Sequence, residues 1–152
     1  MIHKALIVND DATTLFIVNK LVNKAQFAEV TVTANNGEKA LAYFEEIVLL
    51  GENHFSEVPA FIFLDLHMPV INGWKFLEIF SEKYASLFPW VKVIIFSSSI
   101  DEQELNDLRR YVMVSDFLST PVNIEKIQRL KEKLLYAKRP DLFIPGSPMV
   151  LN

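Results

Sequence analysis

The strongest constraint on the fold is a strict alternation between short runs of β-forming residues and longer segments with helical periodicity. Three of the β-rich runs are almost continuously apolar, which is typical of strands covered on both faces in a parallel sheet. Five strand–helix units in this order predict one open, doubly wound α/β sheet with right-handed crossovers. The predicted strands are residues 5–8, 30–33, 61–64, 91–96 and 114–118, and the predicted helices are residues 13–26, 37–50, 72–87, 101–112 and 123–137.

The length of 152 residues fits one domain, which we expect to occupy residues 1–137. The remaining residues, 138–152, contain three prolines, which end any helix. This tail is too short to be a domain, so no output domain is expected. Its six large apolar side chains would form an adhesive patch if they were exposed. We therefore expect part of the tail to lie in extended form against the domain or a neighbouring protomer.

The composition excludes several classes of protein. The chain has no cysteine, which rules out disulfides, zinc–thiolate sites, iron–sulfur clusters and a cysteine nucleophile. The net charge of −4 gives no general attraction to nucleic acid or to an anionic membrane. The apolar runs are far shorter than the ~20 residues that span a bilayer, and no signal-peptide core is present at the N-terminus. We expect a cytoplasmic protein with no nucleic-acid or membrane partner.

Polar residues follow the predicted strands directly. In an open parallel sheet, ligands bind beyond the carboxyl ends of the strands. Acids that meet at this edge would suit a hard cation such as Mg²⁺, which takes one or two carboxylates and keeps several waters. A second interpretation is open for the first acidic pair, because either aspartate could cap the following helix. The strand-end residues are Asn9, Asp10 and Asp11, then Asp65, then Ser97 and Ser98, and finally Thr120.

Four motifs, in order, resemble the receiver domain of two-component response regulators. The most specific is residues 61–73, a strand followed by Asp65, a Met-Pro turn and Gly73. The others are residues 9–11, 97–98 and 120–121, and the resemblance covers roughly residues 4–137. It implies a flavodoxin-like fold, with a five-stranded parallel sheet in the order 2-1-3-4-5 and five flanking helices.

The resemblance also implies roles for single residues. Asp65 matches the aspartate that accepts a phosphoryl group from a histidine kinase or a histidine phosphotransfer protein. Asp10 matches a direct Mg²⁺ ligand, and His67 matches a position whose backbone carbonyl is a third ligand. Ser97 matches the hydroxyl residue that turns toward the phosphoryl group, and Phe117 matches an aromatic residue that swings inward on activation.

Two matched positions depart from the family pattern. Asn9 stands where an acid is usual, and Thr120 stands where a lysine is usual and where the bond to Pro121 is expected to be cis. With Mg²⁺ bound, the loss of one acid balances the loss of one lysine, so we expect metal binding to survive. Asn9 could orient a metal-bound water, and Thr120 could offer a hydroxyl but no charge. The link from phosphorylation to conformational switching is expected to weaken.

Other readings of the strand-end aspartate are less consistent with the residues. A haloacid-dehalogenase-type hydrolase needs a second acid two residues later, where this chain has His67. A flavodoxin-like electron carrier or a dinucleotide-binding domain needs a glycine-rich phosphate loop, which is missing. We therefore expect no enzyme. One alternative stays open: a pseudo-receiver that binds proteins without phosphorylation. In either case the signal would leave through the helix after Ser99, the fifth strand and the last helix, toward a target protein or a second copy of the chain.

Overall fold

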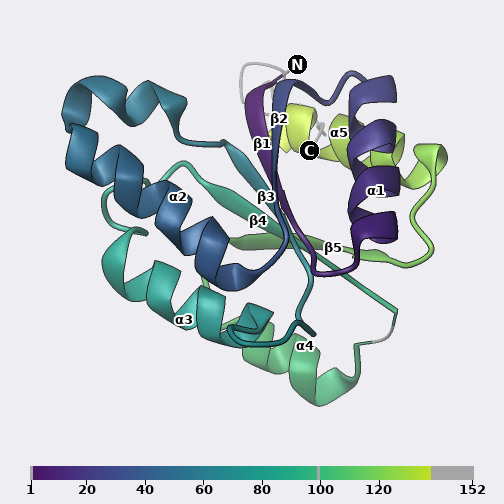
Figure 1. Ribbon diagram of the computed structural model, residues 1–152. Coiled ribbons are helices and arrows are strands. Elements are labelled where there is room, and N and C mark those ends of the chain that lie inside the picture. Colours follow the sequence, from purple (N-terminus) through teal and green to yellow (C-terminus); the bar gives the residue numbers. More distant parts are fainter. Residues whose placement is uncertain (1, 99, 138–152) are drawn as a thin grey trace, which may run out of the picture.

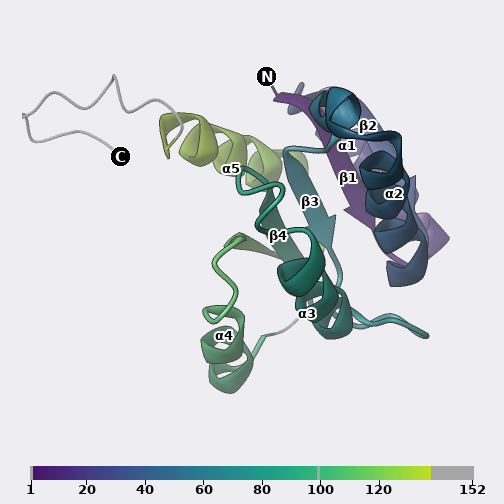
Figure 2. The ribbon, with the colours of Figure 1, turned by 90° about the vertical axis from the view of Figure 1, so that its left-hand side faces the viewer.

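A five-stranded parallel sheet forms the centre of the molecule, with the strands in the order β2-β1-β3-β4-β5 (Figure 1). The computed structural model describes residues 2–98 and 100–137. The strands are β1 (Ile2–Val8), β2 (Ala28–Ala34), β3 (Phe61–Leu64), β4 (Lys92–Ser97) and β5 (Val114–Ser119). All four neighbouring pairs are parallel, and Figure 2 shows the arrows of β1 and β3 pointing the same way. The predicted fold class and strand order are therefore confirmed.

In the described residues, four α-helices and one short 3₁₀-helix connect the strands, and a fifth α-helix follows β5. They are α1 (Ala12–Lys24), α2 (Gly37–Leu50), η1 (Glu52–Glu57), α3 (Gly73–Lys83), α4 (Glu102–Leu108) and α5 (Ile124–Ala137). Each of these α-helices begins directly after an Asp or Asn whose side chain accepts a hydrogen bond from a backbone N–H of the first turn. Such caps satisfy donors that have no partner inside the helix, and they place each helix start just beyond a strand.

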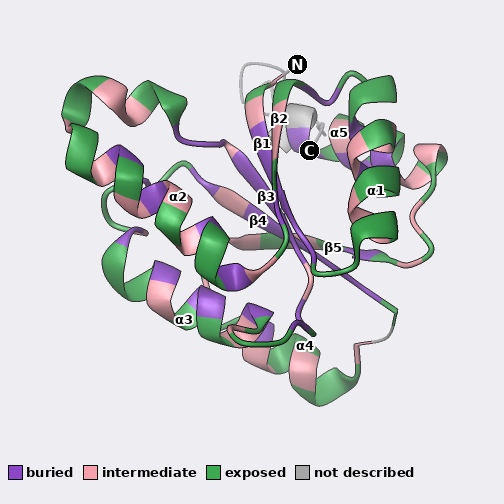
Figure 3. Cartoon of the chain, viewed as in Figure 1, coloured by how far each residue is buried: buried purple, intermediate pink, exposed green. Residues whose placement is uncertain are grey.

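The sheet divides the apolar core into two layers. Leu6 and Val8 pack with residues of α2, α3 and α4 on one face of the sheet. Ala5 and Ile7 pack with residues of α1 and α5 on the other face. Successive side chains of a strand point to opposite faces, so both faces of β1 must be apolar. This explains the continuous apolar runs in the sequence, and Figure 3 shows the central strands largely buried between the helices.

Several element boundaries differ from the sequence-based predictions. β1 begins three residues before Ala5, because Ile2 and Lys4 already pair with Ala28 and Val30 of β2. The predicted loop at residues 51–59 contains η1. α4 ends at Leu108 rather than Val112, whose side chain is exposed and finds no apolar surface to cover. The expected packing of residues 138–152 lies outside the described residues.

Candidate functional site

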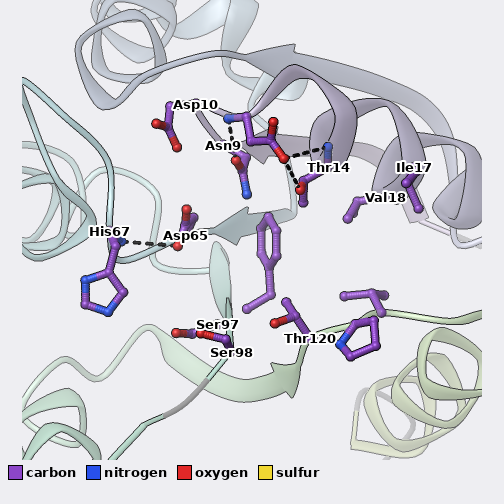
Figure 4. Close-up of a pocket in the computed structure, with 14 residues that line it drawn as sticks. Asn9, Asp10, Thr14, Ile17, Val18, Asp65, His67, Ser97, Ser98 and Thr120 are labelled. Atoms are coloured by element: carbon purple, nitrogen blue, oxygen red, sulfur yellow. Dashed lines mark hydrogen bonds between the residues drawn. The ribbon is translucent and has the colours of Figure 1, made fainter.

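The carboxyl ends of β1, β3, β4 and β5 meet at one edge of the sheet and form a pocket of about 700 Å³. Parallel pairing produces this arrangement, because Val8 is in register with Leu64 and Ser97 with Ser119. The pocket brings together every strand-end residue that the sequence predicted for the site. It is lined by Asn9, Asp10, Asp11, Thr14, Ile17, Val18, Asp65, His67, Phe96, Ser97, Ser98, Thr120, Pro121 and Val122 (Figure 4).

Asp65 is the half-buried acid of this pocket. The backbone N–H of His67 donates a hydrogen bond to its Oδ1 at 3.1 Å. Burial raises the pKa of the Asp65 carboxyl above its ordinary value, and the negative charge of Asp10 raises the pKa further, whereas the hydrogen bond from His67 opposes both effects. None of the pocket-lining residues that the structure describes is a lysine or arginine. The carboxylate therefore lies in an acidic environment that favours a cation.

The two neighbouring aspartates after β1 have different surroundings. Asp11 caps α1, since its Oδ2 accepts hydrogen bonds from the Thr14 backbone N–H at 3.3 Å and from the Thr14 hydroxyl at 2.5 Å. The hydrogen bonds from Thr14 lower the pKa of Asp11. The helix-cap interpretation therefore applies to Asp11. Asp10 stays exposed on the pocket side near Asp65, where its carboxylate is accessible to a cation.

Asn9 holds the turn between β1 and α1. Its side chain is only 4% exposed, and its Oδ1 accepts a hydrogen bond from the Asp11 backbone N–H at 2.7 Å. Its backbone N–H donates to Ala34 O in β2 at 3.1 Å. An amide oxygen has two lone pairs, so this contact leaves one that could accept from a water. The expected role of Asn9 toward a metal-bound water stays a prediction.

The oxygen-rich side chains of the pocket fit Mg²⁺. Within residues 2–98 and 100–137, no group of three or more His, Cys, Asp or Glu side chains is arranged to hold a metal. The available donors are the carboxylates of Asp10 and Asp65 together with amide and backbone oxygens, and Mg²⁺ binds such sites while it keeps several waters. The imidazole of His67 is exposed and turned away from Asp65 (Figure 4). This agrees with a role for its backbone rather than its ring.

The hydroxyl residues Ser97 and Thr120 form the opposite wall of the pocket. Ser97 is 4% exposed, and its backbone carbonyl accepts a hydrogen bond from the Thr120 N–H at 3.0 Å. The Thr120–Pro121 peptide bond is cis, which confirms the prediction. The sequence analysis missed Lys126 of α5, whose ammonium binds the loop on both sides of Thr120. No sequence motif marks this residue, because the contact depends on how α5 packs beside β5.

The loop between β3 and α3 packs closely against the backbone of Asp65. The Gly73 N–H donates to Leu66 O at 2.9 Å. A Cβ at Gly73 would lie 2.5 Å from the carbonyl oxygen of Asp65, so only glycine permits this approach. Val70 in the same loop has a φ of 67°, an uncommon conformation for a β-branched residue. The loop therefore carries local backbone strain next to the acidic pocket.

The strand order defines a doubly wound, flavodoxin-like domain, with an acidic pocket at the carboxyl edge of its sheet. The sequence profile of the response regulator receiver domain matches residues 5–132. The chain therefore belongs to the response regulator receiver domain family, as the sequence resemblance predicted.

Solved structures share the fold. A two-component response regulator from Cytophaga hutchinsonii is 23% identical, with 88% of this chain and 97% of that chain covered and a TM-score of 0.75. Chemotaxis protein CheY4 from Vibrio cholerae is 20% identical, with 88% and 98% covered and a TM-score of 0.70. The bacteriophytochrome response regulator AtBRR is 23% identical, with 100% and 98% covered and a TM-score of 0.66.

Two curated relatives correct one expectation. Both are named protein-glutamate methylesterase/protein-glutamine glutaminase: one from Trichodesmium erythraeum is 25% identical over 137 residues, and one from Methanococcoides burtonii is 23% identical over 133. The match covers 87% of this chain in each case but only 35% and 34% of the relatives, so the chain spans about a third of their length. The expectation that this chain is no enzyme is contradicted by these relatives, because both carry the name of an enzyme. What they share with this chain corresponds to the receiver domain.

The helices give no sign of a membrane span. In the part of the chain that the structure describes, none of them is both long enough and apolar enough to cross a bilayer.

Proposed function

We propose that this receiver domain accepts a phosphoryl group on Asp65 from a histidine kinase or a histidine phosphotransfer protein. The observation that carries the proposal is the half-buried Asp65 carboxylate, which lies beside Asp10 in a pocket whose described lining holds no lysine or arginine. A half-buried carboxylate that has a second carboxylate beside it and no cationic side chain is costly, so the arrangement favours an external cation.

The residues support an in-line transfer to a carboxylate. A carboxylate oxygen of Asp65 attacks phosphorus, the bond between phosphorus and the donor histidine nitrogen breaks, and that nitrogen takes up a proton. The hydroxyls of Ser97 and Thr120, on the opposite wall, donate hydrogen bonds to phosphoryl oxygens. Asp10, Asp65 and the His67 backbone carbonyl would hold Mg²⁺, with Asn9 contributing through a water. When bound, Mg²⁺ supplies the positive charge that phosphoryl oxygens need in the transition state.

The direct test is incorporation of phosphate from acetyl phosphate in the presence of Mg²⁺. We expect incorporation by the wild type and none by Asp65→Asn. Asp10→Asn should lower the affinity for Mg²⁺, whereas Asp11→Asn should leave it almost unchanged, because Asp11 is committed to capping α1. Incorporation by Asp65→Asn that equals the wild type would refute the assignment of the acceptor.

A pseudo-receiver that binds proteins without phosphorylation is the second candidate. It is favoured by the neutral Asn9 and Thr120 at positions where the family usually carries charged residues. The same experiment separates the two functions. A wild type that takes up no phosphate at saturating Mg²⁺ supports the pseudo-receiver.

The output surface that we propose consists of α4, β5 and α5. Phe117 of β5 is 36% exposed there and lies between two grooves, one along α4 and one along α5. This surface would bind a downstream protein or a second copy of the chain, in the cytoplasm and without nucleic acid or membrane. Substitution of Phe117 should change association, measured by analytical ultracentrifugation, and leave Mg²⁺ affinity intact. The reverse result would contradict this placement.

A further inference from the structure

Lys126 joins α5 to the loop that carries Thr120. Its Nζ donates to Ser119 O at 2.9 Å, to Ser119 Oγ at 3.0 Å and to Pro121 O at 2.9 Å. We propose that Lys126 is a positioning residue of the Asp65 site, which acts by fixing Thr120 from the side opposite the pocket. This inference rests on the proposed phosphoryl transfer, because it assigns a role within the same site.

The contacts of Lys126 hold both sides of Thr120. One bound carbonyl belongs to the preceding residue and the other to the following residue, while the Thr120 N–H donates to Ser97 O at 3.0 Å. The loop is thus attached to β4 through the Thr120 N–H and to α5 through Lys126. An ammonium has three N–H donors, and in Lys126 all three find oxygen acceptors.

The location of Lys126 in α5 is unfavourable for a cation. The residue lies in the first turn of the helix, where its backbone N–H is bound by Asn123 Oδ1 at 2.9 Å. The positive end of the helix dipole disfavours a positive charge in this turn. Three hydrogen bonds from a charged donor offset this repulsion. The lysine is therefore held by specific contacts with the loop and not by the general field of the helix.

The residue at position 120 explains why the loop needs this support. A lysine would act through a charge on a long, flexible side chain, which tolerates displacement of its backbone. A threonine hydroxyl acts only over hydrogen-bond distance, and its contribution falls steeply with poor geometry. The backbone of Thr120 must then be placed accurately relative to the phosphoryl oxygens. Lys126 fixes that backbone.

Lys133 provides a matched control on the same helix. It lines the same groove as Lys126, and its Nζ forms an ion pair with Asp116 at 2.9 Å. This ion pair lies with β5 and not with the loop at residues 119–121. Its substitution by methionine also removes one positive charge from the groove, without releasing Thr120.

The test measures the rate of phosphate incorporation from acetyl phosphate at saturating Mg²⁺. We expect Lys126→Met to slow phosphate incorporation about threefold to tenfold, the effect of losing one well-placed hydrogen bond from Thr120. Lys126→Arg should restore part of the rate. Lys133→Met should change it less than about twofold. Thr120→Val removes the hydroxyl, and Lys126→Met should add nothing in that background, because Lys126 acts through Thr120. Urea unfolding of each variant confirms that the fold is intact.

A second measurement separates this proposal from the proposed function. The amide signal of Thr120 in the ¹H–¹⁵N spectrum, and its hydrogen exchange, report the loop directly. If the wild type takes up no phosphate, the phosphoryl-transfer function fails. Faster hydrogen exchange of the Thr120 amide in Lys126→Met than in Lys133→Met would still support the positioning of Thr120 by Lys126. The proposal is overturned if both variants leave Thr120 equally protected, or if the losses from Lys126→Met and Thr120→Val are additive.

Discussion

Gly73→Ala should destabilise the protein and disturb the metal site, although alanine is the better helix former by ~1 kcal/mol. The added Cβ would lie 2.5 Å from Asp65 O and 2.6 Å from Leu66 Cα. Ordinary van der Waals contact begins at 3.4 Å, so the first residue of α3 and the Asp65 backbone must separate by about 0.9 Å. Overpacking of this kind costs ~1–3 kcal/mol, and the upper end applies because both contacts are backbone atoms. The net loss is then ~2 kcal/mol.

Urea unfolding and a Mg²⁺ titration measure the two effects of Gly73→Ala. A loss of ~2 kcal/mol corresponds to a fall in Tm of ~4–8 °C for a domain of this size. We expect Mg²⁺ affinity to fall severalfold, because the displaced backbone carries Asp65. Gly51→Ala is the control: its φ of 100° also penalises a side chain, but a Cβ there meets nothing within 4 Å. It should lose stability without losing Mg²⁺ affinity. A Gly73→Ala protein that is as stable as the wild type would refute the reasoning.

Three further predictions concern the same edge of the sheet. Val70→Asn should raise the free energy of unfolding by about 1 kcal/mol in urea, because Val70 is 83% exposed and asparagine tolerates its positive φ; a loss of stability would contradict this. Asp11→Ala should lower the free energy of unfolding by ~0.5–2 kcal/mol by removing the cap of α1, with Mg²⁺ affinity retained. A loss of affinity as large as that of Asp10→Asn would contradict the assignment of Asp11 as a helix cap. Burial raises the pKa of Asp65 in the folded protein above its ordinary value of 3.8. The free energy of unfolding therefore falls as pH rises from the pKa of Asp65 in the unfolded chain to its pKa in the folded protein. Without metal at pH 7, Asp65→Asn should therefore be more stable than the wild type, with a difference that shrinks below this window and on addition of Mg²⁺; equal stability at all pH values would argue against the shift.

The sequence was sufficient to predict the sheet and the placement of the site. Alternation of apolar runs and amphipathic segments leaves few packing solutions, and a parallel sheet necessarily brings Asp10, Asp65, Ser97 and Thr120 to one edge. The cis bond before Pro121 followed from the resemblance alone. These features depend on the order and pattern of apolar and polar residues along the chain, which can be read from the sequence.

Other features depend on tertiary geometry that no local pattern contains. The sequence left open whether Asp10 or Asp11 caps α1, because both residues are aspartates and both positions suit a cap. The choice depends on the turn that buried Asn9 holds through the Asp11 N–H. The positive φ of Val70 was also missed, since valine is among the last residues expected in that conformation. Likewise, the contacts of Lys126 arise only once α5 lies beside β5.

The division of the core by the sheet has a mechanical consequence for Asp65. It directly follows β3, in which Phe63 packs in the layer of α1 and α5 and Leu64 packs in the layer of α2, α3 and α4. A displacement of Asp65 thus acts on both layers through two covalently adjacent side chains. Because all four residues of β3 are buried, this strand has little room to absorb such a displacement. We therefore expect a displacement of Asp65 to be transmitted to the helices on both faces of the sheet.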